Sequence, residues 1–275
     1  KISLLLVNAR ITRKSFNRWK LIINFAKKVF EKFDMCIVSN KESKKFLEIL
    51  GAKNIKNYGN IKFSSVKADL NKKLDLDLLA KLSDRKIWCA ASTHPTEELL
   101  CANSHKKIKK YHNNVLTIII PRHIERVKKI NEDLLNLNLK IVLSSKSDQL
   151  NSDTDILLVD SYGEASKYYN ISKYVFVGKS LMKSLIKDSG QNPIEPAKLG
   201  CKIFHGPYTS NFIEIYEYLG SCGITKKILD SNELSLSLVE DFKKNLSKNH
   251  EIIAKIENYG QNIFNNTIIE IKKYI

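Results

Sequence analysis

Residues 86–98, which read KIWCAASTHPTEE, decide the fold. The first half is an apolar run without alternation, as in a strand that is covered on both faces. The second half changes to small and polar residues and then to Pro95 followed by acids, which is typical of the first turn of a helix. A buried strand followed directly by a helix is the repeating unit of an α/β fold with a parallel sheet.

The same alternation extends in both directions from this stretch. Apolar runs predict further strands at residues 3–7, 35–39, 115–121, 140–144, 156–160, 174–178 and 202–204. Amphipathic patterns predict helices at residues 16–33, 96–111, 124–137 and 211–219. In the first helix, one apolar face contains Trp19, Ile22, Ile23, Ala26 and Phe30. Residues 231–275 are predicted to be helical with a short break near Gly260.

The periodicity is lost at residues 61–74, which are rich in Lys, Ser and Asp, and this indicates a domain boundary. We expect residues 1–65 to be the C-terminal part of a first Rossmann-like domain and residues 66–250 to form a complete second one. Residues 251–275 are expected to be a helix that packs back towards the first domain. Because the chain opens with Lys1 directly on an apolar run, we expect it to be part of a longer protein.

The composition is strongly basic. Lys and Arg number 46 against 29 Asp and Glu, which gives a formal net charge of +17. Such an excess favours a nucleic acid or an anionic membrane as partner. All but six of the basic residues are lysine, which is typical of an AT-rich coding sequence and spreads charge over the whole surface. We therefore expect attraction to an anionic lipid surface and no nucleic-acid site.

The arginines and cysteines carry further information. Five of the six arginines fall within residues 10–18 and 122–126, where the planar guanidinium suits phosphate or carboxylate binding unless the clustering is chance. The five cysteines contain no C-x-x-C pair, so no zinc site is expected, and their odd number suits a reducing cytoplasm. No stretch of about 18 apolar residues predicts a membrane-spanning helix.

Small and polar side chains follow several predicted strands. Because the carboxyl ends of parallel strands meet at one edge of a sheet, they predict a nucleotide or sugar site there. The candidates are Ser92, Thr93, His94, Pro121, Arg122, Tyr162, Gly163, Glu164, Ser180, Asn192, Pro193, Ile194 and Glu195. No G-x-G-x-x-G and no complete P-loop pattern occurs.

Several candidates also have a local interpretation. Arg122 either binds a phosphate or pairs with Glu125. Glu164 either holds a ribose hydroxyl or caps its helix. A role in starting a helix competes with ligand binding at three further positions: His94, Asn192 and Glu195.

An ordered set of segments covers nearly the whole chain. The segments are Asn8-Ala9-Arg10, Gly59-Asn60-Ile61-Lys62-Phe63, Ala91-Ser92-Thr93-His94-Pro95 with Glu97-Glu98, Pro121-Arg122-His123 with Glu125-Arg126, Gly163-Glu164, Phe176-Val177-Gly178 and Asn192-Pro193-Ile194-Glu195-Pro196-Ala197. In this order and spacing they resemble the 3-deoxy-D-manno-octulosonic acid (Kdo) transferases. The resemblance implies a glycosyltransferase-B fold of two Rossmann-like domains, the first of them incomplete here.

The resemblance also implies an inverting glycosyltransferase that moves Kdo from CMP-Kdo to a lipid A precursor (lipid IVA) in lipopolysaccharide biosynthesis. It implies no metal and no cofactor, and a peripheral position on the cytoplasmic face of the inner membrane. The implied CMP pocket contains Pro121, Arg122, Tyr162, Gly163, Glu164, Asn192, Pro193, Ile194 and Glu195. Possible cleft residues are Ser92, Thr93, His94, Ser180, Arg10 and Arg13.

The sequence departs from the family pattern in several places. The family's catalytic glutamate and membrane anchor have no counterpart here, so we expect no catalytic residue in this chain and no activity of these 275 residues alone. Lys179 stands where a small residue is usual, and Asp188-Ser189 replaces part of a glycine-rich loop. Two alternatives stay open: a basic, non-catalytic module that binds a membrane or a nucleic acid, and a transferase or epimerase of the same fold with another nucleotide-sugar.

Overall fold

The computed structural model describes residues 2–65, 73–244 and 250–275. The chain divides into a first unit, Lys1–Lys67 with Ala254–Ile275, and a second unit, Ala68–Ile253. The boundaries expected at 65/66 and 250/251 border on residues 66–72 and 245–249, which lie outside the described residues.

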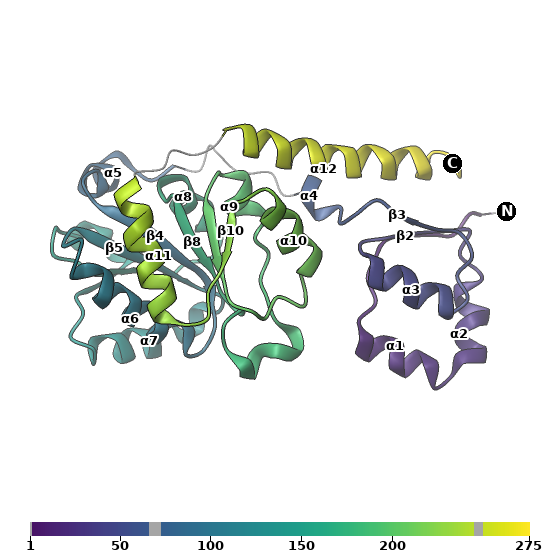
Figure 1. Ribbon diagram of the computed structural model, residues 1–275, viewed down its shortest axis with the longest axis horizontal. Coiled ribbons are helices and arrows are strands. Elements are labelled where there is room, and N and C mark those ends of the chain that lie inside the picture. The colour runs from purple at the N-terminus through teal and green to yellow at the C-terminus, as the bar shows by residue number, and fades with distance from the viewer. Residues whose placement is uncertain (1, 66–72, 245–249) are drawn as a thin grey trace. The chain divides into compact units, whose positions relative to one another are not determined.

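The first unit contains a small parallel sheet in the order β1-β2-β3 (Figure 1). Its strands are β1 (Leu5–Ala9), β2 (Met35–Val38) and β3 (Ile55–Asn57). Its helices before the boundary are α1 (Arg13–Lys20), α2 (Ile23–Phe30), α3 (Lys41–Ile49) and α4 (Lys62–Ser65). The central strand β2 is buried at every residue, and Phe16 of α1 stacks on Phe46 of α3 with ring centroids 4.1 Å apart.

The single helix predicted over residues 16–33 is wrong. The structure has two shorter helices, α1 and α2, with a turn at Leu21 and Ile22. Thr12 starts α1, because its hydroxyl accepts a hydrogen bond from the Ser15 N–H at 3.3 Å. The turn carries Ile22 out of the apolar face on which it was expected, and its side chain is 51 % exposed.

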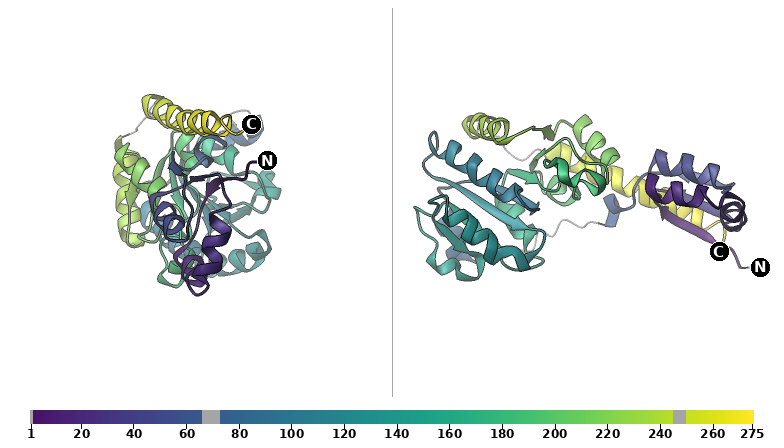
Figure 2. Two further views of the ribbon diagram at one scale, coloured as in Figure 1. Left: turned by 90° about the vertical axis from the view of Figure 1, so that its right-hand side faces the viewer. Right: turned by 90° about the horizontal axis from the view of Figure 1, so that it is seen from below.

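The C-terminal part of the terminal helix α12 (His250–Ile271) lies alongside the first unit's strands (Figures 1 and 2). Tyr58 donates a hydrogen bond to Glu270 at 2.9 Å. The break predicted near Gly260 is wrong, since α12 runs through this residue without interruption. Gly260 instead permits close packing: a Cβ there would lie 2.5 Å from the carbonyl oxygen of Phe63.

The second unit contains a seven-stranded parallel sheet in the order β10-β9-β8-β4-β5-β7-β6. Its strands are β4 (Lys86–Thr93), β5 (Val115–Pro121), β6 (Ile141–Leu143), β7 (Ile156–Leu158), β8 (Tyr174–Val177), β9 (Lys202–His205) and β10 (Thr225–Lys227). The short strands β3 and β10 were not predicted, because each has only three residues and includes exposed positions.

Helices precede, connect and follow the strands of the second unit. They are α5 (Leu76–Leu82), α6 (Glu97–Lys109), η1 (Ile124–Arg126), α7 (Val127–Leu135), η2 (Ser144–Gln149), α8 (Ala165–Ile171), η3 (Lys183–Asp188), α9 (Ile194–Lys198), α10 (Ile213–Ser221) and α11 (Ser231–Lys244). This arrangement confirms the predicted α/β class with parallel sheets.

Both faces of the second sheet are covered. On one face, Trp88 and Ala90 of β4 join a core cluster with residues of α6 and α11. On the other face, the thiol of Cys89 lies 3.7 Å from the Tyr168 carbonyl of α8. Cys36, Cys89 and Cys201 are all buried.

Candidate functional site

The order of strands in the second sheet reverses at β4. The chain passes from β4 to its neighbour β5 on one side and returns later to β8 on the other. Ligands of open α/β sheets bind at the carboxyl ends of the strands beside such a reversal. The segments that follow β4 and β8 are joined there, because the Gly178 N–H donates to the Ala91 carbonyl at 2.8 Å.

A buried carboxylate holds these two segments together. Glu97, at the start of α6, is completely buried. Its oxygens accept four backbone hydrogen bonds, from the N–H groups of His94 (3.0 Å), Lys179 (2.7 Å), Ser180 (3.0 Å) and Leu181 (3.2 Å). Burial raises the pKa of Glu97, while the four N–H donors favour its ionised form. Glu97 thus fixes the shape of this edge without facing solvent.

The role of Glu97 was missed at the level of sequence. An acid in the first turn of a helix is common because it faces the positive end of the helix dipole, so Glu97 was assigned to helix initiation. The available signal was the small residue at position 178. A Cβ on Gly178 would lie 2.6 Å from the Ser92 carbonyl oxygen and 2.8 Å from Glu97 Oε2.

The candidates directly after β4 and β8 lie close together but are largely enclosed. Ser180 is fully buried, with its hydroxyl donating to Val177 O at 2.6 Å and accepting from the Gly206 N–H at 2.9 Å. Its expected place in an open cleft is therefore corrected to a structural link towards the end of β9. Thr93 is also fully buried, and its hydroxyl finds no hydrogen-bond partner among residues 2–65, 73–244 and 250–275.

His94 is 8 % exposed. Its Nδ1 lies 3.1 Å from the Ser92 carbonyl oxygen, and its ring meets that of His123 edge-on, with centroids 5.9 Å apart. Burial lowers the pKa of His94, and the nearby Lys179 contributes in the same direction. A neutral imidazole is therefore favoured at this position.

Arg122 leaves the sheet edge as an exposed side chain. Pro121 ends β5 and is buried, and the Arg122 N–H donates to the Thr93 carbonyl at 3.1 Å. The alternative pairing of Arg122 with Glu125 is not observed. Glu125 instead lies 3.2 Å from the Tyr162 hydroxyl and 3.3 Å from His123 Nδ1. The guanidinium is thus exposed beside the ends of β4 and β5.

The second arginine of this stretch is already occupied. Arg126 forms a two-pronged ion pair with Glu98, with nitrogen–oxygen distances of 2.9 and 3.1 Å. The side chain of Glu98 is only 4 % exposed, so the pair fixes the loop after β5 against the start of α6. Of the two ligands expected for arginine here, Arg126 binds a carboxylate within the protein, and the exposed Arg122 remains the candidate for a phosphate.

The remaining candidates follow β7 and β8. Glu164 pairs with Lys167 and makes no capping hydrogen bond at the start of α8, so its expected alternative role as a cap is wrong. Glu195 accepts a hydrogen bond from Ser166, which joins the starts of α8 and α9. Asn192 Oδ1 accepts the Ile194 N–H at 3.1 Å, as expected for a turn before a helix.

Three more candidates complete this part of the edge. Gly163 has φ +79° with open space where a Cβ would stand. Pro193 and Ile194 are buried and support the start of α9. The hydrogen bond between Tyr162 and Glu125 connects the loop after β7 to the loop after β5.

Arg10 and Arg13 belong to the first unit. Both are exposed, and Arg13 lies 3.4 Å from Glu42. Within the described ranges 2–65, 73–244 and 250–275, no group of His, Cys, Asp and Glu could hold a metal ion. No helix in those same ranges is long and apolar enough to cross a membrane.

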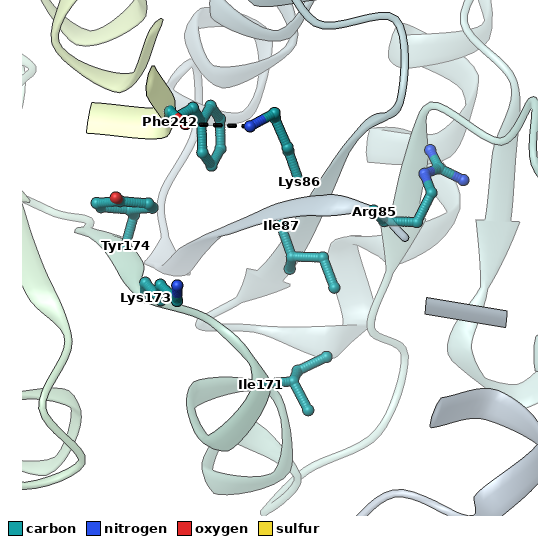
Figure 3. A pocket seen from close by; sticks show the side chains of 7 residues that line it. All are labelled: Arg85, Lys86, Ile87, Ile171, Lys173, Tyr174 and Phe242. Atoms are coloured by element: carbon teal, nitrogen blue, oxygen red, sulfur yellow. Dashed lines mark hydrogen bonds between the residues drawn. The ribbon is translucent and has the colours of Figure 1, made fainter. Parts of the chain in front are cut away.

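A hollow of about 120 Å³ lies at the opposite, amino edge of the second sheet (Figure 3). It is basic, but its cations are engaged. Lys86 donates to the Phe242 carbonyl at 3.0 Å and lies 5.6 Å from the centroid of the Phe242 ring. Arg85 donates to four backbone carbonyls, those of Asn114, Asn151, Val115 and Thr154. These contacts hold strand beginnings in place, so this edge is not the candidate site.

The paired α/β units are those of a glycosyltransferase-B fold, and comparison with solved structures supports this. The C-terminal CMP-Kdo binding domain of WaaA from Acinetobacter baumannii matches with a TM-score of 0.57 at 24 % identity, covering 68 % of this chain and 94 % of that one. A putative UDP-N-acetylglucosamine 2-epimerase from Listeria monocytogenes matches with a TM-score of 0.59 at 16 % identity, covering 99 % of this chain and 68 % of that one.

Sequence comparison shows similarity to one group of transferases within this fold. The profile of the family described as 3-Deoxy-D-manno-octulosonic-acid transferase (kdotransferase) matches residues 1–65. A 3-deoxy-D-manno-octulosonic acid transferase of Rickettsia bellii is 31 % identical over 92 % of this chain and 65 % of its own length. One from Haemophilus influenzae is 30 % identical over 79 % of this chain and 51 % of its length. Along most of its length the chain is similar to Kdo transferases, and it spans less than two thirds of these relatives.

Proposed function

We propose that the chain acts in the transfer of Kdo from CMP-Kdo to a lipid A precursor (lipid IVA) in lipopolysaccharide biosynthesis. The reaction would use no metal and no cofactor besides the substrates, and would take place at the anionic, cytoplasmic face of the inner membrane. The observation that carries the proposal is an exposed arginine, Arg122, at the carboxyl edge of a parallel sheet beside its reversal point. No nucleic-acid partner is proposed.

In this proposal, the donor's CMP lies along the carboxyl edge of the second sheet. Arg122 faces the phosphate, because its guanidinium offers several N–H donors in one plane and remains charged. Tyr162, Gly163 and Glu164 border the nucleoside, and the turn at Asn192 before α9 closes the other side. Glu97 does not touch the ligand but holds the segments after β4 and β8, so that this edge needs little reordering when CMP binds.

The transfer step follows from general chemistry. A carboxylate base removes the proton of an acceptor hydroxyl, and the resulting oxygen attacks the anomeric carbon of Kdo. The bond from that carbon to the phosphate oxygen breaks, and CMP leaves with the electron pair. Arg122 stabilises the negative charge that grows on the phosphate. The family resemblance assigns the base to a loop that none of these 275 residues matches, so we propose that they bind the donor without completing the transfer.

Calorimetric titration with CMP tests the pocket. Arg122→Ala is expected to weaken CMP binding by about 1.5–3 kcal/mol, or roughly 10- to 150-fold, because a hydrogen-bonded ion pair with the phosphate is lost. Lys110→Ala removes the same charge from an exposed position just after the end of α6, and it should leave the affinity unchanged. Equal weakening by both variants would reduce the role of Arg122 to net charge.

The same titration separates the remaining alternatives. Tighter binding of UMP than of CMP would replace the donor assignment by another nucleotide-sugar. No nucleotide binding together with strong, salt-sensitive DNA binding would favour a basic module without catalytic function. Glycosyl transfer by the 275 residues alone would contradict the proposal that they do not complete the reaction.

A further inference from the structure

The start of the chain concentrates positive charge. Residues 1–30 contain eight basic and no acidic side chains, although the whole chain carries 29 Asp and Glu. Helices α1 and α2 lie within this stretch and are joined by the short turn at Leu21 and Ile22. We call α1, this turn and α2 together the basic hairpin, residues 13–30.

The tip of the basic hairpin exposes large apolar side chains. Leu21 is 85 % exposed, Ile22 is 51 % exposed and Phe25 is 59 % exposed. They do not serve the core of the first unit, because Phe16 and Ala26 of the same helices already fill it. In Figure 1 this turn lies at the bottom of the purple unit, on the side away from β2 and β3. Such a group of adjacent exposed apolar residues marks an interaction site.

Exposed basic side chains lie on both helices that lead to the apolar tip. Lys14, Arg18, Lys20, Lys27 and Lys28 are all exposed on α1 and α2. A segment that combines an exposed apolar tip with basic helices and has no acid of its own has the composition of segments that lie in a membrane interface. The apolar groups enter the boundary between headgroups and acyl chains, while the cations meet anionic headgroups.

We propose that the basic hairpin is the surface that docks the first unit onto an anionic lipid membrane, with Leu21, Ile22 and Phe25 entering the interface. The inference rests on the proposed function at a membrane and names the residues that make the contact. The charge distribution selects lipid over a second copy of the chain. A symmetric dimer through this surface would bring two acid-free, basic hairpins together, and like charges oppose that contact.

Vesicle sedimentation of the full chain is the first test. The chain should bind vesicles with phosphatidylglycerol much more tightly than vesicles of phosphatidylcholine alone. Leu21→Ser with Phe25→Ser should reduce binding to the anionic vesicles at least tenfold. Leu229→Ser with Leu236→Ser is the matched control, because both leucines are 60 % exposed but lie in the second unit, and it should bind like the parent. Equal loss in both variants would overturn the proposal.

A charge variant separates electrostatic from apolar contributions. Lys27→Gln with Lys28→Gln should weaken binding to the anionic vesicles by about fivefold per lysine, with a smaller dependence on salt. It should change binding to neutral vesicles little. Unchanged binding to anionic vesicles would contradict the assignment of these side chains to the contact.

The two tryptophans provide a local readout. Trp19 lies on α1 next to the tip and is half-buried, with its ring centroid 5.3 Å from that of Phe30. Trp88 is completely buried in the second unit. Lipids that carry bromine in the acyl chain should quench the emission of Trp88→Phe, which retains Trp19, and leave Trp19→Phe nearly unquenched. Quenching of Trp88 alone would place the contact elsewhere.

Two controls distinguish lipid docking by the basic hairpin from the proposed CMP site. The Leu21→Ser, Phe25→Ser variant should bind CMP like the parent, so loss of lipid binding with intact CMP binding concerns the hairpin only. Failure of CMP binding in the parent, with lipid docking intact, would overturn the donor site and not the hairpin. Sedimentation velocity without lipid should give the same mass for both proteins, and a shift from dimer to monomer in the variant would favour a second copy as the occupant.

Discussion

The two edges of the second sheet use polar side chains in opposite ways. At the amino edge, the cations Arg85 and Lys86 donate to backbone carbonyls at the beginnings of strands and the end of α11. At the carboxyl edge, the anion Glu97 gathers backbone N–H groups. There Arg122 remains exposed, with the Glu125 carboxylate engaged by its other neighbours. Charged groups that hydrogen-bond to the backbone stabilise the fold, whereas an exposed charged group at the end of a strand can bind a ligand.

A buried network surrounds Asp155, which lies at the amino edge of the second sheet just before β7. Its carboxylate is contacted by His105 Nε2 at 3.1 Å, by the Lys109 ammonium and by the Lys140 N–H at 2.9 Å. Burial raises the pKa of Asp155, but these hydrogen bonds outweigh burial and hold the pKa well below its usual value. His105 is fully buried, and its other ring nitrogen lies 2.9 Å from the Thr117 hydroxyl.

The largest effect is expected from Asp155→Ala. Removing the carboxylate takes the hydrogen-bond partner from the buried His105 ring, from the Lys140 N–H and from the partly exposed Lys109 ammonium. Each buried donor that is left unsatisfied costs about 1–3 kcal/mol of the free energy of unfolding. Urea denaturation measures this loss. CMP affinity of the folded fraction should stay within about twofold of the parent value, since the network lies at the other edge. A large loss of CMP affinity without loss of stability would contradict the assignment of structural contacts to the amino edge and ligand binding to the carboxyl edge.

Gly178→Ala is expected to damage both stability and binding. The added Cβ would meet the Ser92 carbonyl oxygen at 2.6 Å and Glu97 Oε2 at 2.8 Å. Because both distances are too short for a Cβ, the backbone there must shift. Overpacking of this kind costs about 1–3 kcal/mol. Gly223→Ala is a suitable control for the substitution, because Gly223 has open space around its Cβ position, although its φ of +76° adds some strain. Calorimetry with CMP should show weaker binding only for Gly178→Ala.

Glu97→Gln is expected to have a moderate effect. The amide replaces one acceptor oxygen by N–H groups that face backbone donors, so about 1–3 kcal/mol of stability is lost. Because the segments after β4 and β8 are then held less firmly, CMP should also bind several-fold more weakly. Glu132→Gln, at an exposed position of α7, should change neither quantity. Unchanged CMP affinity in Glu97→Gln would show that this carboxylate serves stability alone.

The pH dependence of stability provides a smaller effect with a definite sign. Because the pKa of Asp155 is lower in the folded chain than its unfolded value of about 3.9, the folded state binds fewer protons. The contribution of Asp155 is therefore present above pH ~4 and is lost as the pH falls towards the folded pKa. Stability measured between pH 7 and pH 3 should fall less steeply in Asp155→Ala than in the parent.

Tyr162→Phe should have the smallest effect. It removes one hydrogen bond, to Glu125, from a side chain that is 60 % exposed. The free energy of unfolding should change by less than about 0.5 kcal/mol. A small decrease in CMP affinity is expected if the bond aligns the loop after β7 with the loop after β5. A change as large as that of Arg122→Ala would move the centre of the site towards Tyr162.

The parts of the fold that the sequence predicts are those with strong local patterns. The apolar run at 115–121 agrees with β5 (Val115–Pro121), because a run without polar alternation fits a strand that is covered on both faces. The turn at Leu21 and Ile22 was not predicted, since no Gly or Pro marks it and its exposed residues continue an apolar pattern. At Gly260 the glycine was taken as a helix break, whereas it serves packing against Phe63.

The candidate site was predicted from which residues follow each strand, and the structure brings these loops to one edge of the sheet. It could not separate exposed from buried side chains within those loops. Arg122 and Ser180 both follow predicted strands closely, yet one is exposed and the other is completely buried. That difference arises from contacts between residues far apart in the chain, such as the bond between Ser180 and Gly206, which no local pattern contains.

Hydrogen–deuterium exchange of the chain with and without CMP tests the central claim most directly. If the carboxyl edge is the donor site, CMP should protect the segments around residues 92–94, 121–126 and 162–164, and exchange around residues 85–87 and 173–174 should stay unchanged. Protection confined to the amino edge, around the hollow bordered by Arg85 and Lys173, would contradict the account.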